Sequence, residues 1–141
     1  MSYTINELYI GQSSSFSKTI TETDVYLFAG VTGDFNPAHL NEKYAQETPF
    51  KKRIAHGMLS AGLISALLGT SLPGEGTIYM GQKLQFLAPV YFNDTITATV
   101  EVKEIIPEKN RVILRTYCKN QDGVVVLDGE AIVLAPKSKT K

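Results

Sequence analysis

The chain has 141 residues, a length typical of one domain with a single core. Its 14 basic and 14 acidic side chains balance, so the composition gives no electrostatic case for binding nucleic acid or a membrane surface. The single cysteine, Cys118, cannot form an intramolecular disulfide and suits a reducing compartment.

The N-terminal residues show no basic segment followed by an apolar run, so the sequence predicts no signal peptide. The longest mostly apolar run, residues 58–69, is too short to span a bilayer. We therefore expect a cytoplasmic protein with no membrane partner. Residues 1–141 should form one domain, in which residues 136–141 are a flexible tail.

The first elements are a short strand and a helix. Residues 16–20 alternate in the manner of a strand, and Thr21 then has the character of a helix N-cap with acids in the following turn. Val25, Phe28 and Ala29 share one face at helical spacing, and Gly33 is a suitable end. A short helix should therefore lead the chain to Asp34.

The turn that follows, GDFNPAHLN over residues 33–41, has two interpretations. Asp, Asn and an Asn-Pro pair are common in connecting loops, because their side chains bond the local backbone. The alternative is that Asp34 and His39 are directed at one small molecule. A spacing of five residues is not a same-face helical interval, and Pro37 disfavours helix at Asn36, so a bent turn would be needed to bring them together.

The next long element, residues 54–74, contains no charged side chain and has apolar residues around every face. A helix without a polar face is normally buried, so we expect this helix inside the domain. The Leu-Pro-Gly at residues 72–74 should end it.

Four strands are predicted in the second half of the chain. The segments are rich in Val, Ile, Thr and Tyr, show much period-two alternation, and cover residues 76–90, 94–106, 111–121 and 123–135. An Asp-Gly pair at residues 122–123 is a hairpin signal. An antiparallel sheet should therefore wrap around the buried helix. One thin sheet cannot cover such a helix on all faces, which predicts a homodimer.

Residues 33–69 resemble the MaoC-like, or hydratase 2, family, which includes the (R)-specific enoyl-CoA hydratases. The D-x-N-P-x-H core followed about twenty residues later by H-G-M is a specific signature, and LPGEGTIYMGQKLQFLAPV over residues 72–90 adds to it. The similarity is to the short bacterial type associated with polyhydroxyalkanoate monomer supply. It implies a hot-dog fold of class α+β, in agreement with the antiparallel sheet and buried helix inferred above.

The resemblance also implies the reaction and the residues. Asp34 and His39 would be the catalytic pair, with Asn36 in their turn, and the backbone N–H of Gly57 would bind the thioester oxygen. Ser65 falls where the short hydratases have a serine near the catalytic acid. The substrate would be trans-2-enoyl-CoA, hydrated on one face to (3R)-3-hydroxyacyl-CoA. No cofactor would be needed, because coenzyme A is part of the substrate.

Adding water to an enoyl thioester requires a nucleophilic water, a proton for C2 and stabilisation of charge on the thioester oxygen. An Asp and a His that hold one water can share the first two tasks, and a positioned acid–base group contributes about 10²–10⁴ in rate. Gly57 begins the long helix, where free N–H groups favour negative charge, and glycine permits close approach. The residues alone do not say which of Asp34 and His39 is the base.

The other polar candidates have plainer interpretations. His56 is interpreted as a structural histidine at the helix start, and Ser65 either orients Asp34 or bonds its own backbone. Lys51, Lys52 and Arg53 could meet the phosphates of coenzyme A or simply form a solvated face. Two histidines and one cysteine give no recognised metal-ligand spacing, so no metal is expected.

Three rival functions share parts of this pattern. A dehydratase acting on acyl-carrier protein would use the same pair in the reverse direction. Resembling thioesterases place a carboxylate on or near the central helix, and residues 54–71 contain none. A non-catalytic acyl-CoA sensor would ordinarily bring a DNA-binding segment, for which this chain has neither the length nor the basic charge.

Overall fold

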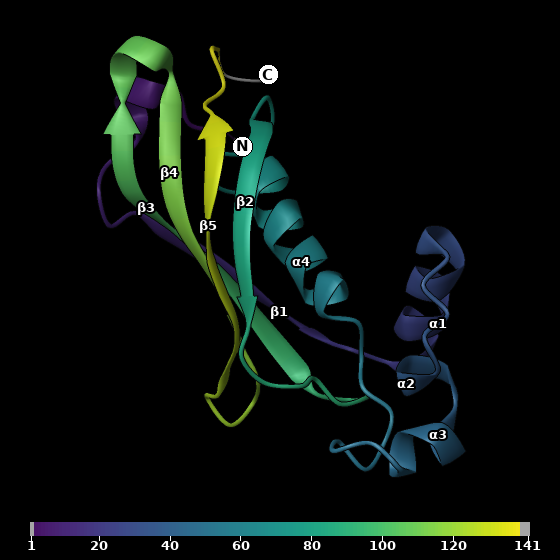
Figure 1. Ribbon diagram of the computed structural model, residues 1–141. Coiled ribbons are helices and arrows are strands. Elements are labelled where there is room, and N and C mark those ends of the chain that lie inside the picture. Colours follow the sequence, from purple (N-terminus) through teal and green to yellow (C-terminus); the bar gives the residue numbers. More distant parts are fainter. Residues whose placement is uncertain (1, 139–141) are drawn as a thin grey trace.

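The computed structural model describes residues 2–138, and its main feature is one antiparallel sheet of five strands (Figure 1). The strands run over Ser13–Thr19 (β1), Ile78–Phe86 (β2), Thr95–Ile106 (β3), Arg111–Lys119 (β4) and Val125–Leu134 (β5). Their order in the sheet is β1-β3-β4-β5-β2, so β1 and β2 form the two edges. All four predicted strands are confirmed, and the early strand begins three residues before the predicted start. Of the predicted tail, residues 139–141 lie outside the described part.

The sheet presents one face to the core because its strands alternate buried and more exposed residues. In β4 the buried residues are Val112, Leu114, Thr116 and Cys118, and the intervening side chains are partly exposed. The same alternation runs along most of β3, where every second residue from Ile96 to Val102 is buried. A period of two places all of these side chains on one face, and that face is turned toward the long helix.

The long helix α4, Gly57–Thr70, lies along the concave face of the sheet (Figure 1). Leu63, Ile64, Leu67 and Leu68 are buried and pack into the core cluster. As expected for one thin sheet, the single chain leaves part of this helix uncovered. Met58 is 55% exposed, and Gly62, Ser65, Ala66 and Gly69 are also exposed. The sheet covers one side of the helix only.

The segment between β1 and α4 forms a separate helical layer beyond the end of the sheet (Figure 1). It comprises α1 (Glu22–Thr32), α2 (Pro37–Leu40) and α3 (Glu42–Gln46). Two single-turn 3-10 helices, Ile5–Glu7 and Pro107–Lys109, complete the regular structure.

The start and end of α1 follow the sequence prediction. The Thr21 hydroxyl accepts from Asp24 N–H at 3.1 Å, and the Asp24 carboxylate accepts from Thr21 N–H at 2.9 Å, which together form a capping box. Gly33 ends the helix with φ of 80°, a left-handed conformation that glycine adopts at little cost. This fixed end delivers the chain to Asp34.

Candidate active site

The turn from Asp34 to His39 is built by its own side chains. The Asp34 carboxylate accepts from Asn36 N–H at 3.2 Å, and the Asn36 amide oxygen accepts from Ala38 N–H at 3.0 Å. Asn36 is thus the N-cap of α2, and Pro37 occupies the first helical position, where its missing N–H costs nothing. One turn of helix then directs His39 back toward Asp34. The bent turn predicted from the five-residue spacing is present, with Asn36 as its cap.

His39 is held in one orientation by the backbone of the segment that precedes α4. Its Nδ1 lies 2.7 Å from the carbonyl oxygen of Ile54, and a carbonyl can only accept, so Nδ1 carries the hydrogen. The Nε2 lone pair is therefore available to the site. Burial lowers the pKa of His39, the Ile54 carbonyl opposes that shift, His56 lowers the pKa further and Asp34 raises it. The net direction is downward, so His39 is a neutral base near neutral pH.

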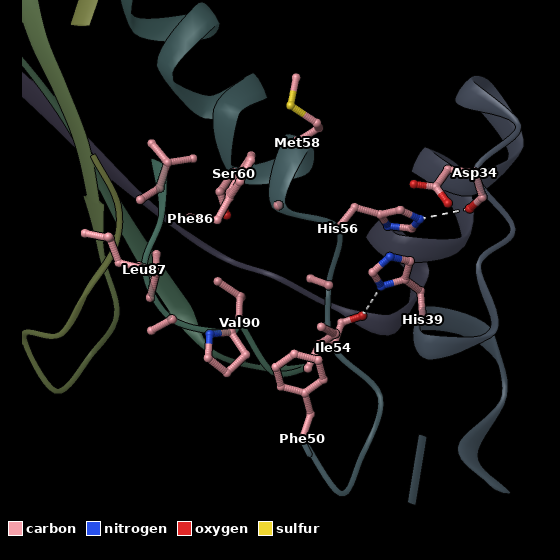
Figure 2. A pocket seen from close by; sticks show the side chains of 16 residues that line it. Asp34, His39, Phe50, Ile54, His56, Met58, Ser60, Phe86, Leu87 and Val90 are labelled. Atoms are coloured by element: carbon pink, nitrogen blue, oxygen red, sulfur yellow. Dashed lines mark hydrogen bonds between the residues drawn. The ribbon is translucent and has the colours of Figure 1, made fainter. Parts of the chain in front are cut away.

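His56 joins this pair, although the sequence indicated only a structural residue. Its Nε2 lies 3.0 Å from the carbonyl oxygen of Asp34, and its ring lies 3.9 Å from that of His39 between centroids (Figure 2). The contact spans 22 residues of sequence, so no local spacing could have revealed it. One ligand atom from each of Asp34, His39 and His56 can be chosen so that all three lie within 4.8 Å of one another.

Gly57 is the first residue of α4 and lines the same cavity. The first N–H groups of a helix have no intrahelical acceptor and lie at the positive end of its dipole. A side chain at this position would collide with Phe86, because an added Cβ would lie 2.6 Å from the ring atoms Cδ1 and Cε1. Gly57 therefore leaves room for the Phe86 ring beside the first N–H groups of α4.

The cavity that contains these groups has a volume of about 400 Å³. Asp34, His39 and His56 are the titratable side chains among the described residues that line it. The remaining lining is mainly apolar, and Figure 2 shows this part of the wall below and beside α4. It includes Phe50, Ile54, Phe86, Leu87, Val90 and Leu127. The site thus has a polar corner at the helix start and a long apolar flank, as small-molecule sites commonly do.

Ser65 is not brought to Asp34 within the chain. It lines a different hollow between α4 and β2, together with Met58, Ala61 and Tyr79. The cavity around Asp34 includes Ser60 from the same helix, one turn nearer its start. Within the described chain, Ser60 Oγ is buried without a hydrogen-bond partner.

The basic cluster at residues 51–53 divides into two parts. The Arg53 guanidinium donates to Glu22 at 3.1 Å, to Glu42 at 3.2 Å and to the Tyr26 hydroxyl at 2.8 Å. These bonds tie α1 and α3 to the segment before α4 and occupy Arg53. Lys52 lies over the ring of Tyr91 at 4.4 Å from its centroid, and Lys51 is exposed. The two lysines are the freer cations of the cluster.

Asp34, His39 and His56 are also the group of side chains that could hold a metal ion. The two imidazole rings are stacked at 3.9 Å between centroids, with a tilt of 32° between their planes. Because nitrogen lone pairs lie in the ring planes, those of two such rings run side by side and converge poorly on one ion. The expectation that no metal binds stays a prediction, and the ring geometry supports it.

Comparison with known proteins gives one family. Residues 6–122 match the MaoC like domain family. An (R)-specific enoyl-CoA hydratase of Rhodospirillum rubrum is 61% identical over 126 residues, which cover 89% of this chain and 87% of that protein. A 3-hydroxybutyryl-CoA dehydratase of Methylorubrum extorquens is 50% identical over 94% of this chain and 84% of its own length. The unliganded structure of an R-hydratase from Pseudomonas aeruginosa superposes with a TM-score of 0.91 at 50% identity, covering 97% of this chain and 88% of that one.

Proposed function

The chain belongs to the MaoC-like domain family, and we propose on that premise that it is an (R)-specific enoyl-CoA hydratase. It is a hydro-lyase with the hot-dog fold, and it converts trans-2-enoyl-CoA and (3R)-3-hydroxyacyl-CoA into one another. The observation that carries the site assignment is the convergence of Asp34, His39 and the N-terminus of α4 on one cavity. Among residues 2–138, His56 is the one further titratable side chain that lines that cavity.

One water held by Asp34 and His39 accounts for the addition. Ligand atoms of the two residues lie within 4.8 Å of each other, and a water about 2.8 Å from each can bridge such a gap. The water donates one hydrogen to the Asp34 carboxylate and one to His39 Nε2, which directs its oxygen lone pair outward at C3. As the C3–O bond forms, one of the two acceptors takes a proton and the pair delivers a proton to C2. Both groups then enter from the same face.

Negative charge moves onto the thioester oxygen while the C3–O bond forms. The Gly57 N–H at the start of α4 is the donor we assign to that oxygen, and the helix dipole adds to its effect. Loss of one such donor can cost about 10²–10³ in turnover. Phe86 borders this position and excludes water from one side of it.

The apolar wall of the cavity suits the acyl part of the substrate, and no cofactor is required by this chemistry. Lys51 and Lys52 are the cations that we assign to the phosphates of coenzyme A, because Arg53 is engaged with Glu22 and Glu42. Asn36 supports the turn by capping α2. Ser65 has no contact with the acid in one chain, so a role in orienting Asp34 would require the second subunit.

We propose that residues 1–141 act as one domain and assemble as a homodimer. The exposed face of α4, with Met58 and Ser65, is the surface that a second copy would cover. None of the helices in the described residues is long and apolar enough to cross a membrane. The unpaired, buried Cys118 supports a reducing compartment, and we propose the cytoplasm.

Substrate competition distinguishes this function from its rivals. Purified protein is given crotonyl-CoA and the same acyl group on an acyl-carrier protein, and loss of the conjugated enoyl absorbance is followed beside release of free thiol. The proposal expects hydration, no thiol release, and a higher kcat/KM for the CoA ester. A higher kcat/KM for the carrier-bound substrate would favour the fatty-acid dehydratase, and thiol release would favour a thioesterase.

A further inference from the structure

His56 is buried at the centre of the polar corner. It is 2% exposed, and its ring contacts those of His39, at 3.9 Å, and Phe28, at 4.7 Å between centroids. It is the N-cap residue of α4, although its side chain makes no capping bond to that helix. The His56 side chain therefore does not stabilise the start of α4 in the way that an N-cap side chain usually does. Its contacts are with the catalytic turn.

The hydrogen bond to Asp34 fixes which ring nitrogen of His56 is the donor. The Asp34 carbonyl oxygen can only accept, so the hydrogen resides on Nε2. Within residues 2–138 the buried Nδ1 has no hydrogen-bond partner. The Nε2–H of His56 is therefore the group that donates to the Asp34 backbone.

We propose that His56 is a positioning residue, which holds the Asp34 backbone through its Nε2–H and the His39 ring through the contact between the two imidazole rings. The inference rests on the proposed function, because it assigns the geometry of the Asp34–His39 pair to a third side chain. It also explains why a histidine directly precedes Gly57. One residue links the acid, the base and the start of the helix that carries the oxyanion donor.

The same contact contributes to the lowered pKa of His39. His56 is one of the groups that lower the pKa of His39, after burial, while the Ile54 carbonyl and Asp34 raise it. Asp34 and His56 are the titratable side chains that face His39 in the cavity. Replacing His56 with an uncharged, non-titrating side chain should therefore allow His39 to bind a proton at higher pH. A residue that only filled space would not produce that change.

The kinetic test uses two substitutions, each of which removes a different property of the His56 side chain. His56→Gln retains an N–H that can reach the Asp34 carbonyl but loses the ring, and His56→Phe retains the ring but loses the donor. Misplacement by about 1 Å can cost roughly 10²-fold in rate, so we expect kcat to fall about 10- to 100-fold in His56→Phe, and less in His56→Gln. KM should change by less than about threefold in both. The acid limb of the kcat–pH profile should move to higher pH in both.

A matched control separates positioning from general loss of packing. Thr116→Val changes a fully buried polar side chain on β4 whose partner is Gln82, away from the catalytic turn. It should lower the unfolding temperature without moving the acid limb. If His56→Phe and His56→Gln show the wild-type acid limb and kcat at equal stability, the positioning role is overturned.

A measurement on the wild-type protein tests the proposal even if a variant fails to fold or the substrate differs from an enoyl-CoA. Side-chain ¹⁵N NMR of the two histidines reports which nitrogen carries the hydrogen. At alkaline pH, where both rings are neutral, we expect His56 to carry its hydrogen on Nε2 and His39 to carry its hydrogen on Nδ1. A neutral His56 with its hydrogen on Nδ1 would overturn the proposal without bearing on hydratase activity.

Discussion

Gly57→Ala tests how closely the start of α4 is fitted to its surroundings. The backbone N–H assigned to the oxyanion is retained in this variant, so any loss must come from the added Cβ. That atom would lie 2.6 Å from Cδ1 and Cε1 of Phe86, where carbon atoms normally approach to about 3.5–4.0 Å. The ring must therefore move by roughly 1 Å. The φ of Gly57 is not positive, so alanine can adopt the backbone conformation.

Overpacking of this kind costs about 1–3 kcal/mol. Phe86 is 54% exposed and can move outward, which favours the lower end of that range. If about 1–1.4 kcal/mol of this strain falls on the transition state, kcat/KM should fall roughly five- to tenfold, at about 1.4 kcal/mol for each factor of ten. Moving the ring also admits water beside the oxyanion donor, so the loss should appear mainly in kcat.

The assay is crotonyl-CoA hydration by Gly57→Ala, Phe86→Ala and the double variant. Removing the ring removes the collision, so Gly57→Ala should cost less than about threefold in the Phe86→Ala background. Gly30→Ala is the control, because a Cβ on this helical glycine of α1 would meet nothing within 4 Å. An unchanged rate in Gly57→Ala, or an equal loss in both backgrounds, would refute the reasoning.

Three further predictions each concern one residue. The pKa of His39 is lowered mainly by burial, so activity should persist below pH 6.5, which a kcat–pH profile checks. The contribution of neutral His39 to folding stability is present above pH 6.5 and should be lost as the pH falls, which unfolding at two pH values checks. Thr21→Ala removes one half of the capping box and should lower the unfolding free energy by about 1 kcal/mol, measured by denaturant unfolding, and an unchanged value would contradict the role of the cap. Arg53→Met breaks two exposed ion pairs and a contact with the Phe92 ring, so it should lower the free energy of unfolding by about 1–2 kcal/mol. KM for the CoA ester should stay constant, and a large rise in KM would instead indicate that Arg53 binds phosphate.

The elements that local chemistry specifies were predictable from the sequence. Thr21 and Gly33 mark the ends of α1 because capping and left-handed glycine act over a few residues. The strands follow from a two-residue period, and the Asp34–His39 turn follows from Asn36 and Pro37. The site pair was reached through the resemblance, and the turn geometry agrees with it.

What the sequence could not show depends on contacts between distant residues. His56 was interpreted as structural, because its partner Asp34 is 22 residues away and the bond is to a backbone oxygen, which no side-chain pattern encodes. Arg53 was placed in a possible phosphate cluster, and its engagement with Glu22 and Glu42 depends on how α1 and α3 pack. The uncharged α4 predicted burial, yet its exposed face has few side chains larger than alanine or serine.

The central claim is that Asp34 and His39 hold one water for addition to C3. The most direct test is crotonyl-CoA hydration by folded Asp34→Asn, which removes the acid–base group at nearly constant shape, with chiral analysis of the wild-type product. We expect turnover to fall by at least roughly a hundredfold, which is within the range for lost acid–base catalysis. The wild type should form the (3R) product, with the new hydroxyl and proton on the same face. A near-normal rate in Asp34→Asn, or a (3S) product from the wild type, would contradict the account.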